Sequence, residues 1–249
     1  MGSYMTINIV FPVLNENKRL LKGVDETVRF LDMYPEIDYC ITIADNGSDE
    51  ENQEIGKEIA NKYEKVRYFY KPEKGVGGVV RSVFKETSSD IVGYMDVDLA
   101  TPPKYILTVM DIFLSTPEVC VINASRLLKS SIVLNRKPIR EITSRGLNIL
   151  LSIVFDIKFT DAMCGFKFFR KQSFEYIEKH TSDDKSWFYC AELLIWAEQL
   201  GHVIHEIPVE WCDDPNTKVE IWKLIKQYLR RICCIRKKIS SINTEPERM

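Results

Sequence analysis

An apolar run that ends in two carboxylates stands in the first half of the chain and reads Ile91-Val92-Gly93-Tyr94-Met95-Asp96-Val97-Asp98. If the run forms a strand, its side chains alternate in direction, so Asp96 and Asp98 point the same way. Two carboxylates on one face repel each other and stay ionised most easily beside a divalent cation. The pattern therefore predicts a metal and diphosphate site. The alternative is a solvated acidic turn, because a bare Asp-x-Asp pair is a weak motif.

Strand and helix patterns alternate around this run. Short apolar runs predict strands, and apolar residues at helical spacing predict the helices between them. The predicted strands are Ile7–Val13, Tyr39–Ala44, Val66–Tyr70 and Ile91–Met95, and the predicted helices are Leu20–Tyr34, Asp49 to about Tyr63, and a helix from Val79. This order predicts an α/β fold, a mostly parallel central sheet with helices on both faces.

Four polar segments fall at the carboxyl ends of the predicted strands: Pro12, Asp45, Lys74–Gly78 and Asp96–Asp98. In parallel α/β sheets, ligands bind outside the carboxyl ends of the strands, so this arrangement predicts a nucleotide site. The glycines allow backbone amides to approach a phosphate, and Lys74 and Arg81 add two cations. The alternative is a flexible turn, since the ending of a P-loop is absent.

Composition narrows the classes of protein. The 249 residues are 45% hydrophobic, which suits one α/β domain. Seven cysteines without a Cys-x-x-Cys pair and three scattered histidines argue against a disulfide framework or a zinc site, so a reducing compartment is expected. No apolar stretch reaches the roughly 18 residues of a membrane span, and no secretion signal is visible.

The last part of the chain is strongly basic. Residues 218–238 hold eight basic residues against one acid, although the whole chain has a net charge of −2. Val219–Ile239 has apolar residues, including Trp222 and Tyr228, at helical spacing between the cations, which is typical of a membrane-surface helix. The alternatives are a helix packed on the sheet or, less favoured, a nucleic-acid contact. Leu147–Phe155 is either a core helix or a helix dipping into the membrane interface.

The second half also contains candidate phosphate ligands and one candidate base. Three arginines and a serine, Arg126, Arg140, Arg145 and Ser144, lie near one another in sequence, and a guanidinium suits a phosphate that is held without being protonated. The alternative is a set of arginines on a solvated helix face. Asp161 stands before a tight turn, where it acts as a general base or hydrogen-bonds the turn.

Several longer motifs carry a family resemblance. They are Lys74-Gly75-x-Gly77-Gly78-x-x-Arg81, Asp161-x-x-Cys164-Gly165-Phe166-Lys167-x-Phe169, Trp187 with Glu192-Leu193-Leu194, and Glu206-Ile207-Pro208-Val209-Glu210-Trp211. In this order they resemble the inverting family 2 glycosyltransferases of GT-A fold, in the branch of polyprenyl-phosphate hexose synthases, most closely the dolichyl-phosphate glucosyltransferases. The resemblance runs from Ile7 to about Trp222 and implies a GT-A domain over residues 1–218, followed by a basic amphipathic tail over 219–249.

The resemblance also implies roles for single residues. Pro12, Glu16 and Asp45 would line the nucleotide pocket, with Lys74, Gly75 and Arg81 by the base or diphosphate. Asp96 and Asp98 would hold Mg²⁺ or Mn²⁺ on the diphosphate, and Lys218 would close over it. Arg126, Arg140 and Ser144 would grip the acceptor phosphate. Two departures matter: Asp45 is followed by Asn46, so it acts alone, and Ala100 stands where mannosyl relatives often have a metal-binding Gln.

The expected function is inverting transfer of a hexose, with glucose from UDP-glucose favoured, to dolichyl or undecaprenyl phosphate. It would take place on the cytoplasmic face of a membrane. A phosphate monoester is already ionised near neutral pH, so Asp161 would position groups rather than act as an obligatory base. One alternative is transfer to a hydroxyl of a glycan or wall polymer, in which Asp161 would be a true base. The other is a non-catalytic membrane-binding module.

Overall fold

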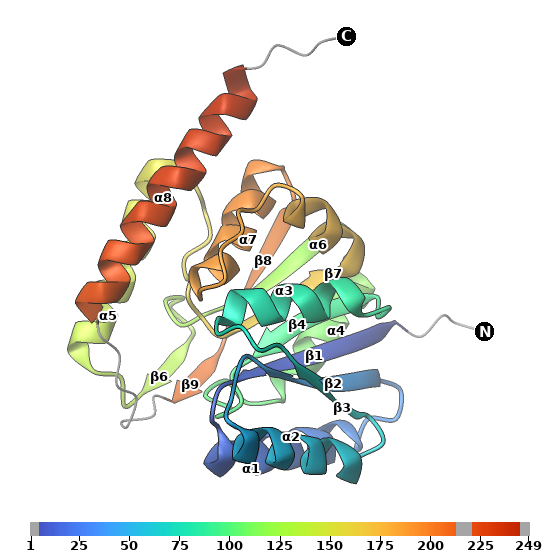
Figure 1. Cartoon of the computed structure of the whole chain (residues 1–249). Coiled ribbons are helices and arrows are strands. Elements are labelled where there is room, and N and C mark those ends of the chain that lie inside the picture. The colour runs from blue at the N-terminus through green and yellow to red at the C-terminus, as the bar shows by residue number, and fades with distance from the viewer. Residues whose placement is uncertain (1–4, 213–220, 245–249) are drawn as a thin grey trace.

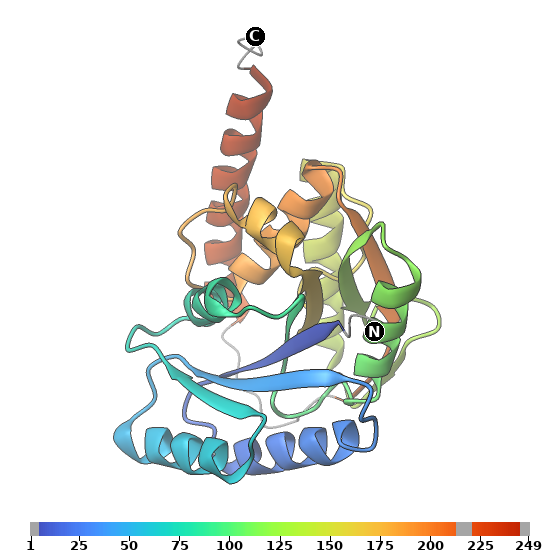
Figure 2. The same ribbon diagram turned by 90° about the vertical axis from the view of Figure 1, so that its right-hand side faces the viewer.

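The computed structural model describes residues 5–212 and 221–244. Its central sheet contains β1 (Thr6–Val13), β2 (Asp38–Asp45), β3 (Val66–Tyr70), β4 (Ile91–Met95), β5 (Val119–Ser125), β7 (Phe166–Arg170) and β8 (Val203–Pro208). These seven strands lie in the order β3-β2-β1-β4-β7-β5-β8 (Figures 1 and 2). Every neighbouring pair is parallel except the two that β7 makes with β4 and β5. The mostly parallel sheet that the sequence predicts is confirmed.

Helices cover both faces of this sheet, as predicted. One face packs against α1 (Asn17–Leu31), α2 (Glu50–Lys62) and α4 (Tyr105–Ser115), and the other against α3 (Val76–Glu86), α6 (Lys171–Glu178) and α7 (Phe188–Gln199). Successive side chains of a strand point to opposite faces. Accordingly Ile9 and Phe11 of β1 join the first apolar cluster, whereas Val10 between them joins the second.

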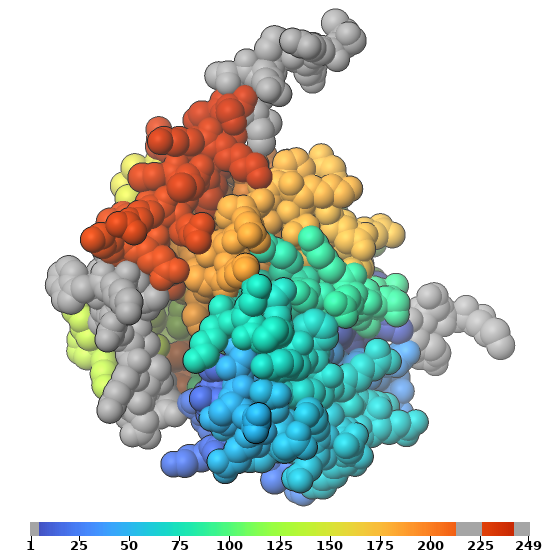
Figure 3. Space-filling view, in the orientation of Figure 1, coloured from blue at the N-terminus to red at the C-terminus, as the bar shows by residue number. Residues whose placement is uncertain are grey.

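Two long helices and a small sheet complete the described chain. α5 (Pro138–Phe155) and α8 (Ile221–Thr244) run beside each other, and α8 extends beyond the rest of the domain (Figures 1 and 3). The strands β6 (Ile132–Leu134) and β9 (Glu210–Cys212) pair in parallel. Across residues 5–212 and 221–244, the structure contains no helix that is both long and apolar enough to cross a membrane.

The apolar side of α8 is used for packing. Tyr228, Ile232 and Ile235 are buried in the apolar cluster that includes α7. Of the alternatives that the sequence leaves open, a terminal helix packed on the domain is therefore correct for these three residues. Basic side chains such as Arg230 and Lys237 remain exposed on the same helix. The predicted first residue, Val219, lies outside the described residues.

The helix limits differ from the predictions in ways that local chemistry explains. α1 spans Asn17–Leu31 instead of Leu20–Tyr34. α3 begins at Val76. Gly77 and Gly78, which were predicted to belong to a preceding turn, are therefore buried helical residues. α5 begins at Pro138, nine residues before the predicted Leu147, with the proline in the first turn, where its missing N–H costs no hydrogen bond.

Candidate active site

Three predicted site residues meet at the carboxyl edge of the sheet. β1 lies between β2 and β4, and its last residue, Val13, is opposite Asp45 in the β1–β2 ladder. Asp96 follows the last residue of β4 directly. The ends of the three strands therefore place Asp45, Pro12 and Asp96 side by side, as expected for the ligand edge of an α/β sheet.

Asp96 is fixed by its contact with a glycine. Its backbone N–H donates to Gly165 O (3.0 Å), and a Cβ added to Gly165 would lie only 1.9 Å from Asp96 Oδ2. Only a glycine at this position leaves room for the carboxylate. Desolvation, followed by the negative charge of Asp98, raises the pKa of Asp96 to about 7.

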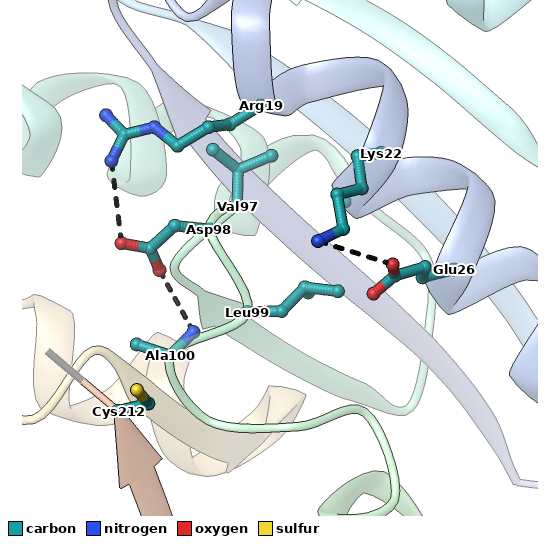
Figure 4. Close-up of a pocket in the computed structure, with 9 residues that line it drawn as sticks. Arg19, Lys22, Glu26, Val97, Asp98, Leu99, Ala100 and Cys212 are labelled. Carbon is teal, nitrogen blue, oxygen red and sulfur yellow. Dashed lines mark hydrogen bonds and ion pairs between the residues drawn. The ribbon is translucent and has the colours of Figure 1, made fainter. Parts of the chain in front are cut away.

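Asp98 sits on a tight turn at the rim of a pocket of about 280 Å³ between α1 and the segment after β4 (Figure 4). Its Oδ1 accepts a hydrogen bond from Ala100 N (3.0 Å), and Leu99 between them has a φ of +55°. Arg19 Nη1 lies 3.7 Å from Asp98 Oδ2. The Nε of the same arginine donates to Glu16 Oε2 (2.8 Å), so Arg19 connects the predicted Glu16 to the carboxylate pair.

The carboxylate pair fits Mg²⁺ or Mn²⁺. Both are hard cations that prefer oxygen ligands, and a cation beside Asp96 would favour the ionised form that its surroundings disfavour. In the part of the chain that the structure describes, no third His, Cys, Asp or Glu side chain joins the pair to form a metal cluster. Mg²⁺ is commonly held by one or two carboxylates together with substrate phosphates, so two protein ligands are sufficient.

Asp45 has both carboxylate oxygens occupied. Oδ1 accepts from Ser48 N (2.8 Å) and Oδ2 from Tyr68 OH (2.7 Å), and the residue is 1% exposed. Asp45 thus stabilises the turn after β2, which lies at the edge of the sheet where Pro12 and Asp96 also lie. Its predicted contact with a nucleotide stays a prediction.

The glycine-rich segment packs against the loop before α7. Gly75 has a φ of +144°, and a Cβ there would lie 2.3 Å from Lys185 O. Its amide donates to Asn46 Oδ1 (3.1 Å), and the amide of Gly78 donates to Gly75 O (3.1 Å). These two amides already have acceptors within the protein, and the predicted phosphate contact of this segment stays a prediction. Lys74 is exposed next to this turn, and its predicted role stays a prediction.

Arg81 joins α3 to the α6–α7 region. Its Nη1 lies 3.2 Å from Asp183 Oδ1 and its Nε 3.3 Å from Glu178 Oε1, and its guanidinium lies 4.2 Å from the ring centre of Tyr189. These contacts hold the guanidinium against the α6–α7 region, although its Nε has no hydrogen-bond acceptor among the described residues. Its predicted contact with the base or diphosphate stays a prediction.

Arg126 and Asp161 form a buried bidentate pair. Arg126 Nε donates to Asp161 Oδ2 (2.7 Å) and Nη2 to Oδ1 (2.9 Å), while the Arg126 amide also donates to Oδ2 (3.1 Å). Burial alone would raise the pKa of Asp161, but the charge and hydrogen bonds of Arg126 outweigh it and lower the pKa to about 2. Such a carboxylate is a weak base, which supports the positioning role predicted for Asp161.

The remaining acceptor candidates lie on or beside α5. Arg140 and Ser144 are in its first two turns, and Arg136 precedes it. The guanidinium groups of Arg126 and Arg136 both lie over Trp211, at 5.1 and 5.7 Å from its ring. The structure thus brings the predicted arginines into one cluster and adds Arg136, which the sequence reasoning missed.

Two further residues at the site were not assigned from sequence. Lys167 of β7 is fully buried, its Nζ donates to Cys164 O, and its charge acts on both Asp96 and Asp161. Burial lowers its pKa. Arg19 had no signal beyond its place in the first turn of α1. Lys167 stood inside a motif that already carried the family resemblance, which was the available signal.

Lys218, expected to close over the diphosphate, lies outside the described residues. All other predicted site residues are within the described chain. They are Pro12, Glu16, Asp45, Lys74, Gly75, Arg81, Asp96, Asp98, Arg126, Arg140, Ser144 and Asp161.

Comparison with known proteins places the chain among sugar transferases. The model of the family described as Glycosyl transferase family 2 matches residues 8–177. Glycosyltransferase AglD from Haloferax volcanii is 28% identical over 86% of this chain and 34% of its own length. Dolichyl-phosphate beta-glucosyltransferase ALG5C from Trichomonas vaginalis is 27% identical over 87% of this chain and 67% of its own length. The chain therefore spans about a third of the first relative and two thirds of the second.

Solved structures support the fold. Glucosyl-3-phosphoglycerate synthase from Mycobacterium tuberculosis superposes with a TM-score of 0.70 and 17% identity, covering 94% of this chain and 81% of that one. Its complex with Mn²⁺, UDP-glucose and phosphoglyceric acid gives a TM-score of 0.71 at 16% identity, covering 94% and 80%. The expected GT-A fold is confirmed. Because the family model matches well over half of the sequence, the chain belongs to glycosyl transferase family 2.

Proposed function

We propose that the protein transfers glucose from UDP-glucose to a polyprenyl phosphate, with inversion at the anomeric carbon. One observation carries the proposal: a carboxylate pair suited to a cation-bound diphosphate lies next to a buried arginine cluster suited to a phosphate monoester. The two are close enough for the charge of Arg126 to act on Asp96. Relatives named as dolichyl-phosphate beta-glucosyltransferases support the acceptor, and a neighbour bound to Mn²⁺ and UDP-glucose supports the donor.

The proposed step is an in-line displacement. An oxygen of the acceptor phosphate attacks the anomeric carbon while the bond from that carbon to the diphosphate oxygen breaks on the opposite side, which inverts the centre. Asp96 and Asp98 would hold Mg²⁺ or Mn²⁺, which would supply positive charge against the leaving diphosphate. Arg19, paired to Glu16, adds a positive charge beside Asp98. The arginine cluster near Trp211 holds and orients the acceptor.

Transfer to a hydroxyl is the weaker alternative. A hydroxyl must lose its proton in the reaction, which requires a general base. Asp161 is fully buried, and its carboxylate oxygens accept hydrogen bonds from Arg126 and from the Met163 amide (3.2 Å). Its pKa is about 2. A phosphate monoester needs no such base, so this environment favours the phosphate acceptor.

Contact with a membrane is proposed through α5 and α8 together. α5 exposes Ile142, Ile149 and Ile153, at 66%, 61% and 76%, on a helix whose other side packs into the domain. Arg236 of α8 reaches Val154 O of α5 (3.3 Å), so basic side chains flank these isoleucines. An apolar face flanked by cations suits an anionic lipid surface. The cytoplasmic face and the part played by Val219 and Lys218 stay predictions.

The test follows UDP release by purified protein with Mn²⁺ and UDP-glucose, with and without farnesyl phosphate. Release that depends on the lipid phosphate is expected, and Asp98→Ala should abolish it at every Mn²⁺ concentration because one of two metal ligands is lost. Asp111→Ala, which removes an exposed carboxylate of α4, is the matched control and should retain activity. Release with farnesol instead of farnesyl phosphate, or full turnover without a divalent metal, would contradict the proposal.

A further inference from the structure

We propose that Arg136 is the arginine that binds the acceptor phosphate directly, and that Arg126 is a positioning residue held by Asp161. This assignment rests on the proposed function and names the residue that would contact its acceptor. The family resemblance gives the gripping role to Arg126 and gives none to Arg136. The contacts of the two side chains favour the opposite distribution.

Arg126 has little capacity left for a ligand. Its Nε, Nη2 and amide all donate to the Asp161 carboxylate, and its side chain is only 8% exposed. Asp161 has no exposed surface. Turning the guanidinium toward a substrate would leave a buried carboxylate unpaired, which is strongly unfavourable. Arg126 therefore stabilises the turn at Asp161 and contributes only its positive charge to the site.

Arg136 is equally buried but has fewer partners. Its side chain is 7% exposed, and its Nε is buried without a hydrogen-bond acceptor among the described residues. Its Nη1 lies 2.6 Å from Glu141 Oε2, but Glu141 also accepts from Arg145 Nε (2.5 Å) and so serves two cations. A buried donor without an acceptor is costly, and a bound water, ion or ligand that accepts from it would remove that cost.

Other charges also act on Arg136. Burial and the positive charges of Arg126 and Arg140 lower its pKa, the carboxylates of Glu141 and Asp161 raise it, and the net shift is downward. Cations that repel one another inside a protein are stabilised when an anion binds between them. The Trp211 ring, 5.7 Å from the guanidinium, supports the plane of the group without using its N–H donors. The missing partner is therefore an anion with several acceptor oxygens.

Ser144 supplies a second unpaired group in the same segment. Its Oγ is buried and has no hydrogen-bond partner in residues 5–212 and 221–244. It lies in the second turn of α5. A phosphate monoester has two negative charges and three terminal oxygens, enough to accept from the Arg136 fork and from Ser144 together.

The test measures binding without turnover, so that it does not depend on sugar transfer. Titration of the whole protein with farnesyl phosphate, with farnesol as the uncharged control, should give an affinity that Arg136→Gln weakens about 10- to 100-fold, the usual loss for hydrogen bonds to a charged group. Arg136→Lys should restore part of it, because the charge returns without the planar fork.

The affinity for UDP-glucose with Mn²⁺ should stay within about twofold of the wild type, since Arg136 belongs to the acceptor side of the site. The control is Arg29→Gln, an exposed arginine of α1, which should change neither affinity.

Thermal melting separates a ligand role from a structural one. Arg136→Gln should melt at or above the wild-type temperature without ligand, because it removes a buried repelled charge and leaves Glu141 paired to Arg145. It should lose the increase in Tm that farnesyl phosphate gives the wild type. Arg126→Gln should melt well below the wild type. A lowered Tm for Arg136→Gln without ligand would assign Arg136 a structural role and overturn the proposal.

The remaining outcomes separate this inference from the proposed function. Unchanged farnesyl phosphate binding by Arg136→Gln, or no binding of either farnesyl phosphate or inorganic phosphate by the wild type, would overturn the assignment. Binding of farnesyl phosphate that requires Arg136, in a protein that transfers no glucose to it, would uphold the anion site and contradict the function.

Discussion

At the residue scale, the number of partners distinguishes the two arginines over Trp211 better than burial does. Arg126 and Arg136 have side chains exposed by 8% and 7%, so exposure alone would give them the same role. Arg126 donates to both oxygens of Asp161, whereas Arg136 shares the carboxylate of Glu141 with Arg145. In a low-dielectric site a donor without an acceptor is costly, so an anion that supplies the acceptor would bind favourably there.

The Asp161 carboxylate should contribute to stability in a defined pH range. Its pKa is about 2 in the folded protein against 3.8 for an ordinary aspartate, so the folded state favours the ionised form by roughly 2 kcal/mol. This contribution is present above about pH 4 and is lost as the pH falls through the folded-state value. Asp161→Asn should unfold more easily at pH 7, by about 3 to 5 kcal/mol, because it leaves the buried Arg126 charge unpaired.

Urea unfolding of both proteins between pH 7 and pH 2.5 is the measurement. The variant should show a smaller loss of unfolding free energy between pH 4 and pH 2.5 than the wild type does. Asp38→Asn, at an exposed position in β2, is the control and should follow the wild-type pH dependence. Identical pH dependence in wild type and Asp161→Asn would show that the pair does not depress the pKa.

The sequence predicts the chemistry of single residues better than their partners. The sequence predicts the Asp96 and Asp98 pair, and the structure places both directly after β4, with Asp98 at the rim of a pocket. Arg136 could not be found this way, because its proposed role rests on the lack of a carboxylate that it does not share. The role also depends on Trp211, which comes from a distant part of the chain.

At the element scale, two helical glycines that look alike in sequence have opposite surroundings. A Cβ at Gly77 of α3 would lie 2.5 Å from Ser186 O and 2.6 Å from Tyr189 Cβ, whereas a Cβ at Gly146 of α5 would meet nothing within 4 Å. α3 therefore packs directly on the segment before α7, and the glycines of the Lys74–Arg81 motif make this approach possible. The sequence suggested a phosphate loop because the partner segment is far away along the chain.

This difference predicts opposite signs for one substitution. Gly146→Ala should raise the free energy of unfolding by about 0.5 to 1 kcal/mol, since alanine favours an exposed helix over glycine. Gly77→Ala should lower it by about 1 to 3 kcal/mol, because overpacking against a backbone oxygen outweighs that same helix preference. Urea denaturation of the two variants and the wild type is the measurement. Stabilisation by both would show that α3 can move away from the segment before α7 at little cost.

At the scale of the whole molecule, the sequence predicts the layers but not the full topology. The alternation of strand and helix correctly indicates a parallel sheet covered on both faces. The antiparallel β7, which inserts between β4 and β5, was not predicted, because apolar periodicity does not encode strand direction. This strand matters for the site, since it carries Lys167 and follows Gly165, the residue against which the Asp96 carboxylate rests.

Vesicle binding tests the surface that α5 and α8 form. Exposed Ile149 and Ile153 lie four residues apart on one side of α5, and transfer of such side chains from water into lipid is favourable by an amount on the order of 1 kcal/mol or more each. The double variant Ile149→Glu/Ile153→Glu should therefore bind anionic vesicles at least about tenfold more weakly than the wild type while melting at a similar temperature. Leu114→Glu, which places the same charge at an exposed apolar position of α4, should bind like the wild type. Because cations of α8 flank the isoleucines, added salt should weaken wild-type binding further. Equal vesicle binding by the double variant and the wild type would mean that α5 does not enter the lipid surface.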